Sequence, residues 1–599
     1  MVTSVATTGT IDVNLSNNND ITSYYDAINI DQDGTGAVTV TTDGALESTD
    51  YSGIEINQSG NGNVTVTADG TVTGGAHAGI DIVTAAGTTG EVNVTTNAAV
   101  SSGAEGIKLD IDGNNAVTIM ATGTVTSSAS EEAIEIEHSG TGNVDVTTSD
   151  TVTATNNDKD AILVNHSGTG NITLTVNANV VGSSSENAIN LSAASGNTSI
   201  ISKTGASFTG GINTSSSGTT TIDLDGTVRA FDNEGINAVR TGGGKITITT
   251  GSLIRSERRA AISVNARTGS GAVEITANGD IWARRQGVYI YNYGSGATIV
   301  RTYGKIDAGG TAYGNGIDIT TFRGQASAIT VHASEIDAGI HGIKIAHQGI
   351  GAIEVTAGHI EADEGVGIQV SANSSRAGAI EVIAENDIDA NNEGIRISQS
   401  GTGAVTVTAN GNIDSDEDDG INVFTRSSST GDVTVTATGN VTGIAGLFVN
   451  NEGSGNVTLT VSGIVTGEIG TAIEIRGRGT QTVIMRDGAS LNGRINAGNV
   501  TGNVMLEFAG EFTDFDFGNH NEDEENNIFG IDGITISESG ALEFETSSPT
   551  VVVPLTLSGR LALTGATSIA NFDAITASGN TGSIEIDVDF SGGSVTLST

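Results

Sequence analysis

A short motif that returns along most of the chain constrains its fold more than any other feature. Residues 36–40 read Gly-Ala-Val-Thr-Val, and the same alternation of β-branched and polar residues returns at Val64 and Val405. From Val38 to Val504 the copies follow one another with a period of roughly 26 residues. A repeat of this length predicts stacked structural units, whereas the length of 599 residues alone would suggest several globular domains.

Each period carries two further motifs, a Gly-x-Val/Ile unit such as residues 70–72 and a Gly/Ala-Ile-x-Ile unit such as residues 53–56. Alternation with period two is typical of strands with one buried face. Segments this short cannot bury a face alone, so we expect Val38 to lie over Val64, with each strand paired to its neighbours at ~4.8 Å. The sequence predicts an all-β fold, a single-stranded, right-handed, three-sided parallel β-helix of about 19 coils. Gly and Asn are expected to supply corners with positive φ.

The composition excludes several classes of protein. The chain has no Cys, which excludes disulfides, thiolate metal sites and thiol nucleophiles. Its 24 Lys and Arg against 70 Asp and Glu give a formal charge of −46, which disfavours nucleic acid and anionic membranes as partners. No apolar run approaches the ~20 residues of a membrane-spanning helix. The first residues lack the basic and apolar parts of an export signal, so the chain is expected to be part of something longer.

The repeat divides the chain into three regions. Residues 1–24 form an irregular edge or weak first coil, and residues 25–510 form the β-helix. Residues 511–599 are predicted to be a C-terminal β cap, because Phe and both prolines concentrate there. The acidic, Asn-rich segment 513–527 is expected to loop out, and sandwich-like β-turns are expected to shield the last edge strand.

The repeated Gly-x-Val-Thr-Val-Thr-Ala-x-Gly and Gly-Ile-x-Ile units across residues 25–510 resemble the passenger domains of bacterial autotransporters, the type V secretion family. The Phe-rich residues after them resemble the autochaperone region of such passengers. The resemblance implies export to the outer membrane, display at the cell surface or release outside the cell, and a C-terminal outer-membrane barrel as partner if the precursor is longer. The chain departs from the family in having neither an export signal nor terminal barrel strands.

A search for catalytic and metal-binding patterns finds no convincing constellation. His138 and His166 lie at equivalent positions of the repeat and are expected to be stacked turn residues. Acidic pairs such as Glu131–Glu132 and Asp158 with Asp160 recur before the Gly/Ala-Ile-x-Ile unit and favour a solvated acidic ridge. We therefore predict no catalytic residues, no metal ligands and no cofactor, with weak Ca²⁺ binding by the ridge as the alternative.

One band departs from the acidic repeat, since residues 229–323 hold 12 of the 24 basic residues. Arg259 and Arg285 are one coil apart, as are Arg258 and Arg284, and each pair is expected to stack ~4.8 Å apart. Tyrosines alternate with Val288 and Ile290, so their rings are expected to point outward. Exposed arginine with aromatic rings suits an anionic or glycan ligand. The candidate binding residues are Arg258, Arg259, Arg284, Arg285, Trp282, Tyr289, Tyr291 and Tyr293.

Three functions fit these patterns. The favoured one is a non-enzymatic cell-surface or secreted adhesin that binds a glycan, a host surface or matrix, or promotes aggregation. The second is a structural fibre or surface-layer component bridged by Ca²⁺, and the third is a carbohydrate-active β-helix enzyme. A plainer interpretation of the basic band also stands, in which the arginines neutralise nearby acids and the tyrosines only cover the sheet.

Overall fold

The computed structural model describes residues 2–6, 9–16, 19–129, 131–156, 158–309, 314–322, 327–512, 528–537, 539–544, 554–563, 575–577 and 583–586. Every helix or strand assigned within these ranges is a β-strand. The chain divides into two compact units, Met1–Phe322 (unit 1) and Arg323–Thr599 (unit 2). Each unit is a parallel β-solenoid, which confirms the predicted all-β stack of coils.

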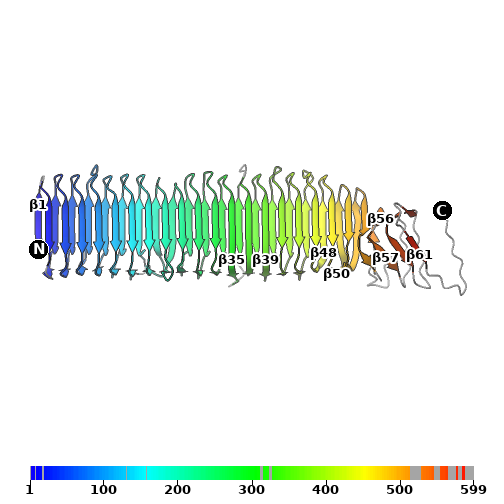
Figure 1. Cartoon of the computed structure of the whole chain (residues 1–599), viewed down its shortest axis with the longest axis horizontal. Coiled ribbons are helices and arrows are strands. Elements are labelled where there is room, and N and C mark those ends of the chain that lie inside the picture. The colour runs from blue at the N-terminus through cyan, green and yellow to red at the C-terminus, as the bar shows by residue number, and fades with distance from the viewer. Residues whose placement is uncertain are drawn as a thin grey trace. The chain divides into compact units, whose positions relative to one another are not determined.

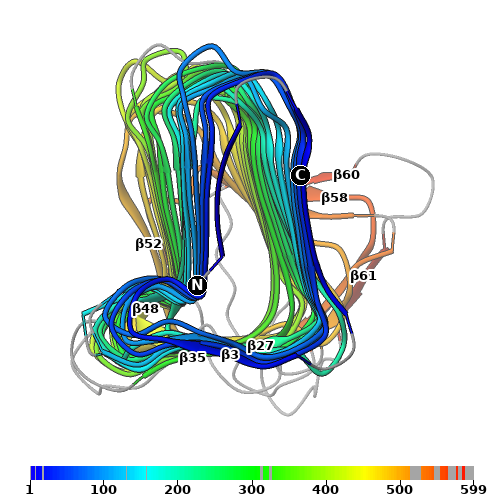
Figure 2. The same cartoon turned by 90° about the vertical axis from the view of Figure 1, so that its left-hand side faces the viewer.

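The coils of unit 1 contribute strands to three faces (Figures 1 and 2). In most coils each face has its own strand, but β35 (Thr298–Ala308) runs through both the second and the third face. The first face, where the Gly/Ala-Ile-x-Ile motif recurs, consists of β1 (Val2–Ala6), β4 (Ile28–Gln32), β7 (Ile54–Gln58), β10 (Ile80–Thr84), β13 (Ile107–Ile111), β16 (Ile134–His138), β19 (Ile162–His166), β22 (Asn187–Ala193), β25 (Gly211–Ser216), β28 (Ile236–Arg240), β31 (Ile262–Ala266), β34 (Val288–Asn292) and β36 (Ile317–Thr321).

The second face, which includes the Val-Thr-Val strands that begin at Val38 and Val64, consists of β2 (Ile11–Leu15), β5 (Val38–Thr42), β8 (Val64–Ala68), β11 (Val92–Thr96), β14 (Val117–Ala121), β17 (Val144–Thr148), β20 (Ile172–Val176), β23 (Thr198–Ser202), β26 (Thr220–Leu224), β29 (Ile246–Thr250), β32 (Val273–Ala277) and β35 (Thr298–Ala308). The short third face consists of β3 (Ile21–Ser23), β6 (Leu46–Ser48), β9 (Val72–Thr73), β12 (Val100–Ser102), β15 (Val125–Ser127), β18 (Val152–Ala154), β21 (Val180–Val181), β24 (Ser207–Thr209), β27 (Thr227–Ala230), β30 (Ile254–Ser256) and β33 (Ile281–Ala283).

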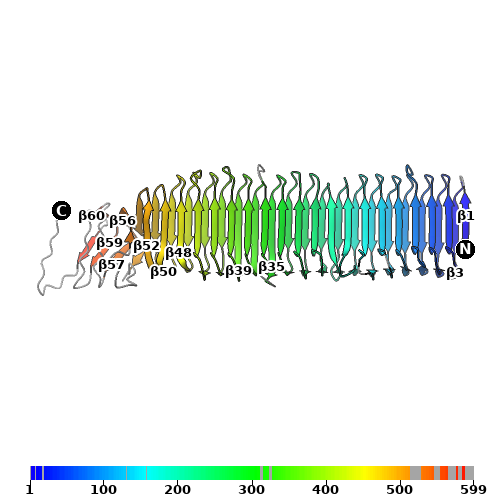
Figure 3. The same ribbon diagram turned by 180° about the vertical axis from the view of Figure 1, so that it is seen from behind.

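Strands pair in parallel with the equivalent strand of the next coil. Ile28 pairs with Ile54 on the first face, and Val38 pairs with Val64 on the second, as the repeat predicts. The starts of β4 and β7 lie 54 − 28 = 26 residues apart, which matches the predicted coil length. Figure 3 shows these strands from behind, side by side through unit 1. Inward side chains such as Ile28 and Val38 are fully buried, because strand alternation points every second side chain into the coil.

Polar side chains form an internal ladder where first-face strands end. The His138 and His166 rings stack with centroids 4.3 Å apart, as predicted, but both side chains are buried, so the prediction that they are turn residues is wrong. Each sits at the last strand position, which points inward. The His138 Nδ1 accepts the Gly140 N–H at 3.0 Å, and its Nε2 donates to the Asn115 carbonyl at 2.8 Å. These contacts fix the neutral ring with its proton on Nε2.

The same ladder contains a fully buried arginine, Arg240. Its Nε donates to the Thr268 carbonyl at 2.9 Å, and its Nη1 donates to the carbonyls of Gly244, at 3.1 Å, and Gly271. Backbone carbonyls therefore surround the guanidinium, and no carboxylate of the described residues pairs with it.

Glycine is needed at the coil corners mainly because neighbouring coils pack closely there, and less often because the backbone has a positive φ. Gly62 and Gly90 are not among the glycines with positive φ. A Cβ on Gly62 would overlap the Gly36 carbonyl, and one on Gly90 would overlap the Gly62 carbonyl. The expectation of positive-φ corners is thus wrong for these repeated glycines, because the coil beneath occupies the space that a side chain would need.

Unit 2 repeats the same parallel pairing. Its strands with an Ile-x-Ile or Ile-x-Val motif after glycine are β38 (Ile343–His347), β40 (Ile368–Ala372), β43 (Ile395–Gln399) and β46 (Ile421–Thr425). Its other strands are β37 (Ile329–Ala338), β39 (Ile353–Ala362), β41 (Ile380–Ala384), β42 (Ile388–Ala390), β44 (Val405–Ala409), β45 (Ile413–Ser415), β47 (Val433–Ala437), β48 (Val441–Asn451), β49 (Val457–Val461), β50 (Ile464–Gly477), β51 (Gln481–Met485), β52 (Ser490–Val500), β53 (Val504–Phe508) and β55 (Ile528–Phe529). Several of these strands, such as β50, continue through a corner without interruption. In other coils the same corner separates two strands.

Parallel pairing continues beyond residue 510. The strands β56 (Gly533–Ile536), β58 (Leu555–Leu557) and β60 (Ile575–Ala577) follow β53 in register. A second parallel sheet is formed by β54 (Glu511–Phe512), β57 (Ala541–Phe544), β59 (Arg560–Leu563) and β61 (Ser583–Ile586). The Phe508 and Phe512 rings meet edge to face, 5.2 Å apart between centroids. The predicted loop 513–527 lies outside the described residues, and the cap boundary at residue 511 stays a prediction.

Candidate ligand-binding face

The third face of unit 1 carries a row of basic and aromatic side chains. Strand pairing puts Arg229 beside Arg255 and Arg255 beside Trp282. The guanidinium carbon of Arg255 lies 4.0 Å from the centroid of the Trp282 ring, which is a cation–π contact. Trp282 is therefore half covered by an arginine of its own chain.

One carboxylate neutralises two of these arginines. Arg255 donates from Nε to Glu257 Oε1 at 2.7 Å, and Arg229 donates from Nη2 to the same oxygen at 3.3 Å. The hydrogen bond from Arg255 holds the pKa of Glu257 below its ordinary value. Arg229 and Arg255 thus fit the plainer interpretation, in which arginines of the band serve neighbouring acids.

The next arginines lie where the chain bends from the third face to the first face, which we call the third–first corner. Arg258 and Arg259 keep 69% and 55% of their side-chain surface exposed. Arg258 pairs with Asp232 at 2.8 Å, and Arg259 pairs with Glu234 at 3.4 Å, both on the preceding coil. Ion pairs this exposed contribute about 0–1 kcal/mol, so an outside anion can compete for these guanidinium groups.

Arg284 and Arg285 stand at the same corner one coil later and are exposed. No acidic residue in the described part of the chain forms an ion pair with either. Their predicted stacking on Arg258 and Arg259 stays a prediction, because the strands before and after this corner are paired with different residue offsets. The third-face strands are offset by 281 − 254 = 27 residues and the first-face strands by 288 − 262 = 26. The first register places Arg284 level with Glu257, and the second places Arg285 level with Arg259.

A strip of aromatic rings follows on the first face. Tyr289 and Tyr291 alternate with buried Val288 and Ile290 and lie half-buried on the outer surface, as predicted. Their ring centroids are 5.0 Å apart. Tyr293, just beyond the strand, is 41% exposed. Burial, followed by the hydrogen bond with Tyr291, raises the pKa of Tyr289, so its hydroxyl stays protonated at neutral pH.

The aromatic strip contains one residue that sequence reasoning missed. Phe322 stacks on Tyr293 with centroids 3.7 Å apart and ring planes inclined by 3°. Tyr293 follows β34, and Phe322 follows β36, at the same register position. Aligning the coils on Asn292 and Thr321 would have revealed the pair. Tyr313 and Arg323, which also belong to the basic band, lie outside the described residues.

The eight candidate residues therefore fall into three neighbouring groups on successive surfaces of unit 1. Trp282 lies on the third face under Arg255, the four arginines occupy the third–first corner, and the tyrosines lie on the first face. Exposed guanidinium groups can bind carboxylate, sulfate or phosphate through paired N–H donors, and exposed ring faces can stack on sugar rings.

The acidic pairs of the corner differ from the expected solvated ridge. Asp158 is exposed and Glu131 is half-buried, but Glu132 and Asp160 are each only 6% exposed. Asp160 accepts the backbone N–H of Asn187 at 2.8 Å, one coil ahead. The prediction of a solvated ridge is therefore wrong for these two inner acids. Asp160 binds the backbone of the next coil, whereas Glu132 pairs with Lys159, whose Nζ lies 3.5 Å from its Oε2.

No group of three or more His, Asp or Glu within the described ranges is arranged to hold a metal ion. The weak Ca²⁺ binding of the acidic corner stays a prediction. The described residues include no helix long and apolar enough to cross a membrane. No protein-family model matches the chain, and no curated protein or solved structure shows significant similarity to it.

Proposed function

We propose that this chain is the passenger of a bacterial autotransporter that acts, without catalysis, as a surface-displayed or secreted adhesin for anionic glycans. The corner arginines Arg258, Arg259, Arg284 and Arg285 would bind the anionic groups, and the strip of Tyr289, Tyr291 and Tyr293 would stack on the sugar rings. The solenoid would serve as a rigid support that holds both at its surface.

One observation carries this proposal. Two adjacent corners of an otherwise acidic molecule present four exposed arginines, and the later pair has no ion-pair partner among the described acids. Arginine whose charge is not used inside the molecule is available to an external anion. The carbohydrate side of the proposal depends on the aromatic strip, because an anion alone would not need it.

The test uses the full chain and a sulfated glycan immobilised on a sensor, with the unsulfated glycan beside it. The variant carrying R258S, R259S, R284S and R285S should bind the sulfated glycan at least about tenfold more weakly, since each arginine offers charge-assisted hydrogen bonds. Lys203→Ser removes an exposed positive charge outside the face and should bind like the parent chain. Equal binding by the parent and the four-arginine variant would contradict the proposal, and so would release of reducing ends from the glycan.

A further inference from the structure

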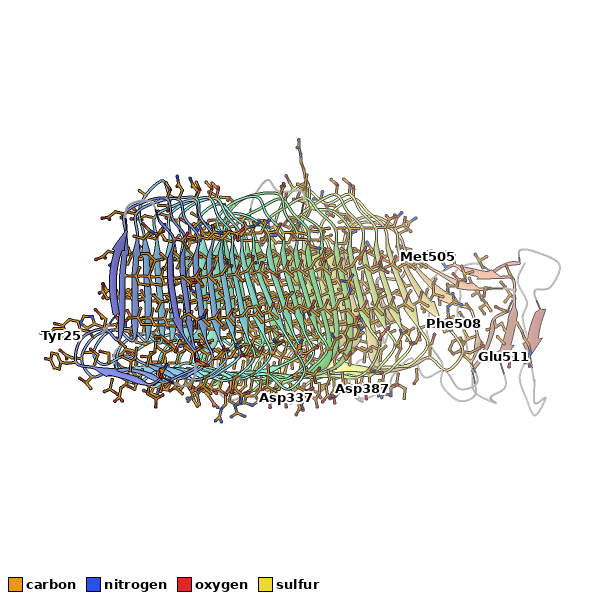
Figure 4. The ribbon with its side chains drawn as sticks, turned by 60° about the vertical axis from the view of Figure 1, so that its left-hand side comes forward. Tyr25, Asp337, Asp387, Met505, Phe508 and Glu511 are labelled. Carbon is orange, nitrogen blue, oxygen red and sulfur yellow. The ribbon has the colours of Figure 1, made fainter. Side chains whose placement is uncertain are left out.

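The N-terminal coils of unit 1 carry a second aromatic cluster, at the same corner as the arginines. Tyr24 and Tyr25 precede β4, Tyr51 precedes β7 and His77 precedes β10. The Tyr25 and Tyr51 centroids are 5.3 Å apart, and the Tyr51 and His77 rings stack at 5.2 Å with planes inclined by 6°. Tyr24 and Tyr25 are 62% and 54% exposed. Figure 4 shows Tyr25 projecting outward from this end of the unit. We call these four residues the tyrosine cluster.

The sequence around the tyrosine cluster is strongly acidic, and the first cation along the chain, Lys108, is paired with Glu105 at 2.9 Å. Residues 1–107 contain 13 Asp and Glu and no Lys or Arg. Asp50 lies within the cluster and interacts with the Tyr24 hydroxyl by hydrogen bonding. Aromatic faces attract cations through their quadrupole, and surrounding carboxylates add to the attraction. The chemistry of this surface thus selects a positively charged partner and disfavours an anionic glycan.

The chain itself shows which cation suits its rings. Arg255 lies over Trp282 at 4.0 Å, and Arg229 lies over Phe231 at 4.8 Å. Arginine combines a planar cation with weak hydration, so it stacks on aromatic faces more readily than lysine does. A surface with several exposed guanidinium groups is therefore the partner that best matches the tyrosine cluster.

Such a surface exists on unit 1 at the same position of the coil. Tyr25 stands three residues before Ile28, and Arg259 stands three residues before Ile262. Both side chains therefore leave the solenoid from the third–first corner. From β4 to β31 there are nine coil steps, which corresponds to roughly 43 Å at ~4.8 Å per step. The arginines and the tyrosine cluster thus lie on one line along unit 1, well separated from each other.

We infer that two copies of this chain pair side by side and antiparallel along the third–first corner, with the tyrosine cluster of each copy against the corner arginines of the other. A two-fold axis midway between the two patches brings both contacts into register at once, because the separation is the same in each copy. The resulting dimer is closed, as an isologous interface requires. The weak, exposed ion pairs of Arg258 and Arg259 can be exchanged for the new contacts at little cost.

The test measures association of the full chain by sedimentation velocity. The parent should form a dimer whose population falls as NaCl rises from about 50 to about 500 mM, because the attraction is screened. The variant Y24S/Y25S/Y51S and the variant R258S/R259S/R284S/R285S should each be monomeric, since either set of changes removes both contacts of a homodimer. Circular dichroism should show unchanged β content in both variants.

Mixing the two variants provides the decisive measurement. The tyrosine variant keeps its arginines, and the arginine variant keeps its tyrosines. A mixture of the two should therefore form a heterodimer held by one of the two tyrosine–arginine contacts. Tyr303→Ser, which removes a tyrosine that is 52% exposed outside both patches, should dimerise like the parent. A monomeric parent, a tyrosine variant that still dimerises, an inert mixture, or open-ended oligomers in place of dimers would each overturn the inference.

The inference shares the corner arginines with the proposed adhesin function, yet the two can fail separately. The tyrosine variant should lose the dimer and bind the sulfated glycan at least as tightly as the parent, because no partner then covers its corner arginines. A chain that dimerises as described without binding any sulfated glycan would contradict only the adhesin proposal.

Discussion

Asp81 illustrates how a single outward residue can work against the stability of its own coil. Burial raises its pKa to about 6, and the charge of Glu105 adds to this effect, although nearby Lys108 lowers the value. A raised folded pKa means that the contribution of Asp81 is most favourable below the unfolded pKa of 3.8 and is lost as pH rises through about 6. At neutral pH the ionised carboxylate is therefore unfavourable where it stands.

Asp81→Asn should consequently stabilise the chain in a pH-dependent way. We expect a higher unfolding temperature than that of the parent at about pH 8, and little difference at about pH 3.5, where the parent carboxyl is already protonated. Thermal unfolding followed by circular dichroism at the two pH values measures this. An identical shift at both would mean that the effect comes from packing and not from ionisation.

His138 gives the opposite pH dependence. Burial lowers its pKa below 6.5, and the adjacent His166 ring adds to that effect, although the hydrogen bond to Asn115 opposes it. A lowered folded pKa means that the stabilisation is present above pH 6.5 and is lost as pH falls through the folded pKa. Protonation would also put a hydrogen on Nδ1, which faces the Gly140 N–H.

His138→Gln should reduce the acid sensitivity of unit 1, because glutamine can accept from and donate to the same backbone groups without titrating. The loss of stability between about pH 7 and 5 should be smaller than in the parent, as measured by chemical denaturation at each pH. Glutamine already fills the equivalent ladder position at Gln32 and Gln58, where both side chains are buried. A parent and variant with parallel pH profiles would exclude His138 as the titrating group.

At the scale of the single coil, the corner glycines decide how closely neighbouring coils approach. Gly244 and Gly243 make a matched pair. A Cβ on Gly244 would overlap the backbone of Gly218 in the preceding coil, whereas a Cβ on Gly243 would meet nothing within 4 Å. Neither glycine is among those with positive φ, so backbone strain does not separate them.

Gly244→Ala should therefore destabilise unit 1 by about 1–3 kcal/mol, the usual cost of overpacking. Gly243→Ala should be neutral, or stabilising by up to about 1 kcal/mol, because alanine restricts the unfolded chain. Equilibrium denaturation of both variants under the same conditions gives the comparison. Similar losses in the two would show that glycine is needed there for its flexibility and not for close approach.

At the scale of the whole molecule, stability is a property of neighbouring coils, because each coil contacts chiefly the coils before and after it. Ile82 is fully buried and pairs with Ile56 on one side and Leu109 on the other. Ile82→Ala should cost about 2–5 kcal/mol, with the damage confined to nearby coils. Hydrogen exchange should accelerate in β7, β10 and β13 and stay unchanged in β28. Uniform acceleration through unit 1 would show that its coils unfold as one cooperative body.

The sequence was sufficient to predict the strands and their register, because Val38, Val64 and their equivalents repeat one pattern of buried side chains coil after coil. It was insufficient for the corners. The rings of His138 and His166 were expected in turns, yet they lie at the last inward position of their strands. Likewise Glu132 and Asp160 are buried, and Asp160 binds backbone across the stack, yet no periodic signal separates these two acids from the more accessible Glu131 and Asp158. The contacts at a corner depend on how many residues the corner contains. This number changes by one between the coils of Arg258 and Arg284, and the pattern of buried side chains does not reveal such a change.

The common register of successive coils has a consequence for how such a gene can change. Because Ile28, Ile54 and Ile80 meet their neighbours through the same backbone bonds, removing or doubling one whole coil joins edges that already match. Unequal recombination within the gene could therefore shorten or extend the protein by single coils while the junction still folds. The distance between the tyrosines and the arginines would then change in steps of one coil. Evolution could thus vary this distance while the buried core of each coil stays the same.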